Sequence, residues 1–143
     1  MMNLPSYAAG MAFHAGVFAA AGLLLTVVAG VSVPGGLRWL IGAVAAVGSL
    51  GGAALFVKRL VTPHMRGLSG PDDFVANALS TAFAAAGGAA AFVPGVSAVW
   101  LAVATAWLLY IPLGKIRHCV FFFTTRYHFG AFFGRRGTFP TRG

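Results

Sequence analysis

Four apolar runs, each long enough to cross a bilayer as a helix, constrain this chain more than any other feature. They cover residues 8–31, 37–57, 74–92 and 97–123. A hydrocarbon core of about 30 Å needs about 20 apolar residues in helical form. Proline and glycine mark the short connections 32–36 and 93–96, whereas the middle connection 58–73 is longer and polar. The pattern predicts an all-α membrane protein with four transmembrane helices forming a bundle.

The composition supports this class. Hydrophobic residues make up 59% of the chain and charged residues 8%, with a mean hydropathy of +0.85. A soluble domain carries roughly 25% charged residues. At 143 residues the chain has no room for a separate soluble catalytic unit beside the spans.

The net charge of +8 comes from ten cations against Asp72 and Asp73. Its placement argues against nucleic acid as a partner, because the cations lie at the ends of the apolar runs and not on a separate basic domain. With four spans, both termini and the middle connection lie on one side of the membrane, and Arg38 is the single cation on the other. The positive-inside rule therefore places both termini and the middle connection in the cytoplasm. The nine cations on the cytoplasmic side are Lys58, Arg59, Arg66, Lys115, Arg117, Arg126, Arg135, Arg136 and Arg142.

Two segments outside the apolar runs have recognisable patterns. Residues 69–73, Ser-Gly-Pro-Asp-Asp, are typical of a helix start, with a proline in the first turn and acids facing the positive end of the helix dipole. Residues 124–143 interleave arginine with aromatic residues and are expected to lie along lipid headgroups or on a partner subunit. We therefore expect a transmembrane domain at 1–123 and a basic aromatic cytoplasmic tail at 124–143.

His14 and His118 are the candidate ligands. One begins the first run and the other ends the fourth, so charge counting and span length put both near the cytoplasmic face. Ionisable groups at membrane depth are costly and by default functional. Two imidazoles from facing helices can hold a haem iron. The lone Cys119 excludes an internal disulfide and a covalently attached c-type haem. Two unrelated histidines, hydrogen-bonded to backbone near the interface, are the alternative.

Other residues fit the same hypothesis. Gly10 and Gly16 are expected to leave room for a macrocycle beside His14. Cations at the right depth would pair with the propionates, and the candidates are Lys115, Arg117, Arg59 and Arg66. His64 and His128 lie in the middle connection and the tail, where a solvated or headgroup role is expected.

Three motifs resemble a known family in order along the chain. Residues 13–17, Phe-His-Ala-Gly-Val, resemble the Phe-His-x-Gly-hydrophobic motif of the gamma subunit of respiratory nitrate reductase. Its relatives include cytochrome b subunits of sulfite-reductase-associated and heterodisulfide-reductase-like complexes. Residues 113–118, Leu-Gly-Lys-Ile-Arg-His, are similar to the Ser-Lys-x-x-His signature that ends the family's last helix. Residues 58–73 resemble the loop between its middle helices.

The resemblance implies a cytochrome b that passes electrons between membrane quinol and a cytoplasmic iron-sulfur partner, in a bacterial or archaeal cytoplasmic membrane. His14 and His118 match one haem-ligand pair. The family's second pair falls on Leu24 and Trp100, which cannot ligate iron, and its additional first helix is missing. One bis-histidine haem b is therefore expected, with menaquinone or ubiquinone as an open further ligand.

Two functions of different classes follow. The first is a mono-haem cytochrome b anchor subunit of a respiratory or photosynthetic electron-transfer complex, which is not an enzyme by itself. The second is a structural or pigment-binding transmembrane subunit with a vestigial haem site. Transport is disfavoured, because no span has a central charge and no broken-helix pattern repeats between the halves of the chain.

Overall fold

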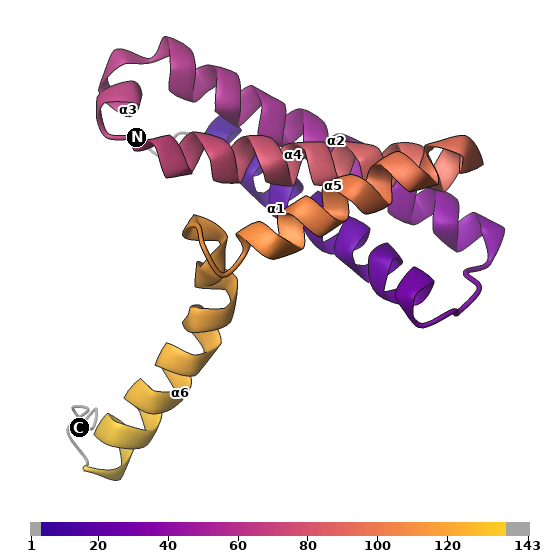
Figure 1. Ribbon diagram of the computed structural model, residues 1–143. Helices are drawn as coiled ribbons and strands as arrows, with labels where there is room; N and C mark the ends of the chain where they lie inside the picture. The colour runs from indigo at the N-terminus through magenta and orange to yellow at the C-terminus, as the bar shows by residue number, and fades with distance from the viewer. Residues whose placement is uncertain (1–3, 137–143) are drawn as a thin grey trace.

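The computed structural model describes residues 4–136, and within this range every regular element is helical (Figure 1). Three helices are long and apolar enough to cross a membrane: α1 (Leu4–Val28), α2 (Gly35–Val61) and α4 (Pro71–Phe92). The bent pair of α5 and α6 would make a fourth span if it is counted as one. The shorter and later elements are α3 (Pro63–Gly67), η1 (Pro94–Val96), α5 (Ser97–Tyr110), η2 (Lys115–Arg117) and α6 (His118–Arg135).

Helix ends follow local chemistry. Thr62, which precedes Pro63, is extended and ends α2, as expected because a proline disfavours the helical conformation in the residue before it. The predicted start at 69–73 is confirmed: Gly70 is the N-cap and Pro71 the first residue of α4. The Asp73 carboxylate accepts a hydrogen bond from the Gly70 backbone N–H at 3.0 Å.

The helices α1, α2 and α4 pack against one another through small residues. A Cβ placed on Gly16 of α1 would come within 2.6 Å of the Gly48 Cα of α2, and one on Gly42 would come within 2.6 Å of the Ala91 Cβ of α4. Contacts this close bring backbones together, and packing of this kind drives association of membrane helices.

Helix α5 packs on α4 and is fixed by two tryptophans. Trp107 stacks on Phe83 with ring centroids 4.3 Å apart, and its indole N–H donates to the Ser80 hydroxyl at 3.0 Å. Trp100 lies against Gly87 of α4, beside Ala20 of α1. We refer to α1, α2, α4 and α5 together as the helical core.

The fourth apolar run differs from the expectation of one span through residue 123. Helix α5 ends at Tyr110, and α6 leaves it at an angle of 76°. Pro112 has no N–H to continue the helical hydrogen bonds, and Gly114 is extended. The boundary expected between residues 123 and 124 falls inside α6, which projects from the helical core (Figure 1). Residues 137–143 of the expected tail lie outside the described range.

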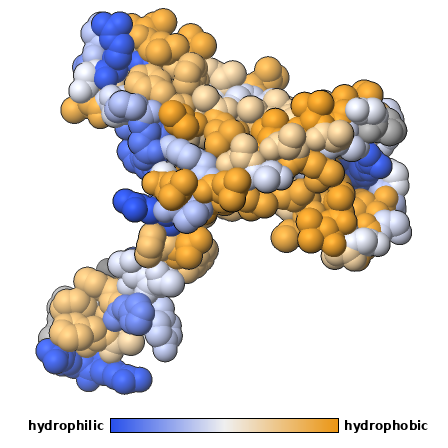
Figure 2. Space-filling model, in the orientation of Figure 1, coloured by the Kyte–Doolittle hydropathy of each residue, from blue (hydrophilic) through white to orange (hydrophobic). Residues whose placement is uncertain are grey.

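Hydrophobic side chains cover most of the visible core surface, with hydrophilic patches at its ends (Figure 2). Exposed apolar side chains occur on all four core helices, for example Phe18, Leu50, Val75 and Leu109. Soluble proteins rarely expose contiguous apolar surface on this scale.

Candidate functional site

His14 lies on the outer surface of α1. Its ring is exposed, and Nδ1 lies 2.7 Å from the Gly10 carbonyl oxygen, one turn earlier in the helix. A carbonyl only accepts, so Nδ1 carries the proton and donates it. The neutral ring then has its lone pair on Nε2.

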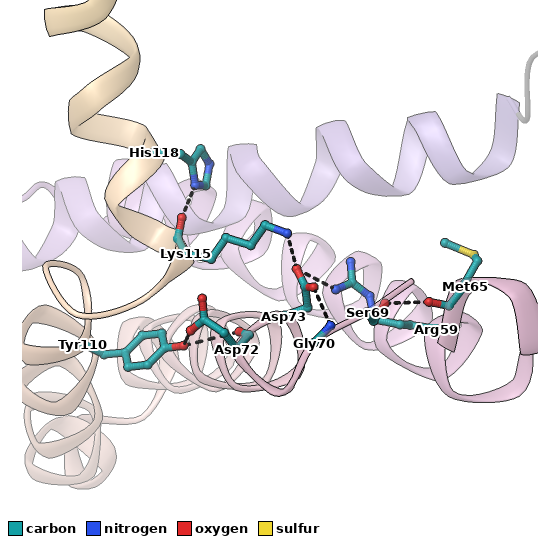
Figure 3. Close-up of polar contacts among 9 residues, drawn as sticks. All are labelled: Arg59, Met65, Ser69, Gly70, Asp72, Asp73, Tyr110, Lys115 and His118. Atoms are coloured by element: carbon teal, nitrogen blue, oxygen red, sulfur yellow. Dashed lines mark hydrogen bonds and ion pairs between the residues drawn. The ribbon is translucent and has the colours of Figure 1, made fainter. Parts of the chain in front are cut away.

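His118 has the same arrangement at the start of α6. It is exposed, and its Nδ1 lies 2.6 Å from the Lys115 carbonyl oxygen (Figure 3). Nε2 is again the nitrogen with the lone pair. A metal-ligating histidine usually donates its other ring N–H to a carbonyl or carboxylate, which fixes ring and tautomer. Both histidines therefore have the donor chemistry of an axial ligand.

His14 in α1 and His118 at the start of α6 both lie toward the end of the helical core that contains the middle connection. The Ser6 hydroxyl near the start of α1 accepts a hydrogen bond from Lys58 near the end of α2. Phe13, the neighbour of His14, lies against Gly52, beside Thr81 of α4. Thr81 is eight residues after Asp73, or about 12 Å along α4 at a rise of about 1.5 Å per residue. His14 is thus deeper in the core than the charged cluster described next.

Asp73 is the centre of that cluster, which we call the Asp73 cluster: Arg59, Asp72, Asp73, Tyr110 and Lys115. The Asp73 Oδ1 atom lies 2.5 Å from the Lys115 Nζ and 3.3 Å from the Arg59 Nη1 (Figure 3). Tyr110 donates its hydroxyl to the Asp72 carboxylate. The cluster joins α2, α4, α5 and η2 through side chains.

The four expected propionate cations therefore differ in their surroundings. Lys115 and Arg59 are already paired with Asp73. Arg117 is exposed and lines an open hollow of about 510 Å³ together with His118, Phe121, Lys115 and the two aspartates. Arg66 is exposed at the end of α3. His14 does not line this hollow.

The two expected macrocycle glycines also differ. Gly10 has open space where a Cβ would lie, and its carbonyl accepts the His14 hydrogen bond. Gly16 is buried against the Gly48 backbone. The close approach of α1 to α2 occupies its open side, so helix packing accounts for the absence of a side chain at Gly16.

The opposite end of the core has a polar site that the sequence patterns did not predict. We call it the Arg38 pocket, a cavity of about 330 Å³ between the ends of α1, α2, α4 and α5. The signal was present in the charge count, where Arg38 is the single cation on its side. Trp100, which falls at a haem-ligand position of the resembled family, also lines this cavity.

The fold and these sites define the chain as an all-helical protein whose long apolar helices are compatible with a membrane-embedded location. No family model, curated protein or solved structure matches the chain.

Proposed function

We propose that this chain is the membrane subunit of an electron-transfer complex and holds one haem b between His14 and His118. One observation carries the proposal. Each imidazole donates Nδ1–H to a backbone carbonyl of its own segment, so each presents Nε2 as a free ligand. The carbonyl lies four residues before His14, within α1, and three residues before His118, in η2.

The two histidines supply the kind of donor atom that a bis-imidazole haem requires, since neutral imidazole is an axial ligand of haem iron. Arg117 and Arg66, which have no described carboxylate partner, are the cations best suited to the propionates. A haem bound there would supply a one-electron carrier. The protein's own part is to fix the orientation and tautomer of each imidazole through its carbonyl hydrogen bond and to supply the cations.

The proposed partners follow from the charge distribution and the family resemblance. A cytoplasmic iron-sulfur protein would approach the side that carries the nine cations, and a quinone would exchange electrons from the membrane. The subunit itself catalyses no reaction in this proposal. It lies in a bacterial or archaeal cytoplasmic membrane, with both termini in the cytoplasm.

The absorption spectrum of the purified full chain, oxidised and reduced, tests the haem. We expect a bis-histidine b-type spectrum that is lost in both His14→Ala and His118→Ala. The matched controls are His64→Ala and His128→Ala, which remove exposed histidines outside the proposed ligand pair and should keep the full spectrum. Retention of full haem by His118→Ala would contradict the assignment.

A second candidate is a structural subunit that anchors a complex without a redox group. The observation in its favour is that α6, which begins with His118, leaves the helical core and has its main contacts with η2. A colourless protein that still assembles with its partners, in wild type and in both histidine variants, would support this function. A pigment held by one histidine would instead be lost in only one of the two variants.

A further inference from the structure

The Arg38 pocket contains a cation that no carboxylate side chain of this protein can neutralise. The sequence has two acidic residues, Asp72 and Asp73, and both lie in the Asp73 cluster. Arg38 hydrogen-bonds through Nη2 to the carbonyl of Ala90, at the other end of α4. Asp73 and Ala90 are 17 residues apart in that helix, which is about 26 Å at a rise of about 1.5 Å per residue. Arg38 therefore has no carboxylate partner among the described residues.

Two buried donors in this pocket have no partner. The Arg38 Nε and the Trp100 Nε1 are the buried side-chain nitrogen or oxygen atoms without a hydrogen bond among the described residues. Trp100 is 3% exposed, so water has little access to its indole. A buried donor left without an acceptor is destabilising. Both residues line the same cavity. Neither nitrogen is exposed to it in this structure, so each side chain has to turn toward the cavity to meet an oxygen-rich group inside it.

The electrostatics of the pocket favour an anion. Helix α2 begins at Gly35 and α5 at Ser97, so two helix N-termini, the positive ends of their dipoles, are close to it. Arg38 adds a full positive charge in the first turns of α2. A guanidinium matches phosphate oxygens geometrically, which makes phosphate a preferred partner of arginine.

The walls of the pocket suit a phosphate that carries hydrocarbon. Leu23, Val27 and Leu101 form apolar lining, and Thr26 and Ser32 contribute hydroxyls near the connection of α1 and α2. The core ends here, and Figure 2 shows hydrophilic surface directly beside hydrophobic surface at this end. If the long helices cross a bilayer, this end lies at headgroup depth.

We propose that the Arg38 pocket binds a phosphate group, with Arg38 and Trp100 as donors. The shared chemistry is a phosphate oxygen anion, supplied by an anionic phospholipid headgroup or by free phosphate. The proposal does not depend on a haem. It concerns the opposite end of the core, and none of its residues belongs to the histidine pair.

Native mass spectrometry of the delipidated full chain in detergent tests the site. Phosphatidylglycerol is titrated in one arm, and inorganic phosphate is added as competitor in the other. Arg38→Gln removes the charge, and Trp100→Phe removes the indole N–H while it keeps an aromatic ring. Since a hydrogen bond to a charged group is worth about 1.5–3 kcal/mol, we expect each variant to weaken lipid binding roughly tenfold or more.

Two substitutions serve as matched controls. Trp39→Phe removes an exposed tryptophan near the same end of the core, and Arg126→Gln removes an exposed arginine of α6. Both should bind lipid like the wild type. If Arg38→Gln does not fold, Trp100→Phe decides the question alone, with the thermal unfolding midpoint as the measure of intact structure.

The two arms separate the sources of the phosphate. Lipid binding that is weakened by the pocket variants and not displaced by inorganic phosphate assigns the site to a phospholipid. Displacement by millimolar phosphate assigns it to the free anion. Equal lipid and phosphate binding by the wild type, the pocket variants that fold and the controls would overturn the proposal.

Discussion

Gly16 and Gly48 determine how closely α1 and α2 approach. The Cβ of any larger residue at either position would lie within 2.6 Å of backbone on the facing helix. Backbone cannot move aside as a flexible side chain can, so a substitution must separate the two helices. The absence of side chains at these positions is a requirement of packing and does not depend on a ligand.

The first prediction concerns Gly48→Leu. We expect this substitution to destabilise the protein by about 2 kcal/mol or more, since overpacking a close contact typically costs about 1–3 kcal/mol. Gly22→Leu is the matched control, because a Cβ at Gly22 meets nothing within 4 Å. Thermal or denaturant unfolding in detergent measures the difference. Equal stability of the two variants would contradict this account of the α1–α2 contact.

At the scale of elements, α5 is held on α4 by one buried polar contact inside an aromatic stack. Phe83 is fully buried and Trp107 nearly so, with their rings almost parallel at 4°. The Ser80 hydroxyl accepts the indole N–H in the same region. The stack provides contact area, and the hydrogen bond satisfies a donor that water does not reach.

The second prediction follows from that contact. Ser80→Ala leaves the Trp107 N–H without an acceptor and should cost about 1–3 kcal/mol of stability. Adding Trp107→Phe in the same chain removes the orphaned donor, so the double variant should lose less than the sum of the two single losses. Thr105→Ala is the control, because the Thr105 hydroxyl is exposed and bonds only within α5. Additive losses would argue that the hydrogen bond contributes little.

At the scale of the whole molecule, the Asp73 cluster connects the segment that leads into α6 to the helical core. Asp73 pairs with Arg59 of α2 and with Lys115 of η2, the segment that leads into α6. Its side chain is 15% exposed and that of Lys115 is 62% exposed. Solvent weakens such a pair, so several modest contacts together hold the junction.

The third prediction is that Asp73→Asn loosens this junction. Loss of two ion pairs should raise amide hydrogen exchange in residues 111–118 several-fold, because exposed pairs contribute about 0.2–1 kcal/mol each. Exchange in α1 should not change. His128→Asn, which alters an exposed residue of α6 away from the cluster, serves as control. Unchanged exchange at 111–118 would show that backbone contacts alone hold α6.

The fourth prediction tests the orientation expected from the charge distribution. In a Cys119→Ser background, Leu68→Cys and Ser32→Cys place one thiol at an exposed site on each side of the helical core. A membrane-impermeant maleimide applied to intact cells should label position 32, and should label position 68 only after the membrane is opened. The reverse pattern would invert the topology and place the Arg38 pocket on the cytoplasmic side.

Local sequence was sufficient to predict most of the helices. Run lengths and hydropathy predicted the helical class and the approximate bounds of α1, α2 and α4, and the Pro71–Asp73 pattern located the start of α4. These features depend on residues close in sequence. The same pattern reasoning did not predict the break between α5 and α6, although Pro112 and Gly114 were visible, because proline occurs both within membrane helices and at their ends.

The sites depended on tertiary structure. Asp73 meets Lys115 across 42 residues, and Arg38 meets Ala90 across 52. Hydropathy determines which segments are helical, but not which faces of the helices meet. The small residues at the contacts determine which faces meet, since the close approach at Gly16, Gly42 and Gly48 sets how near the helices lie. The sequence alone therefore determined the helices and the uneven charge of their ends, and packing decided that Trp100 would share a cavity with Arg38.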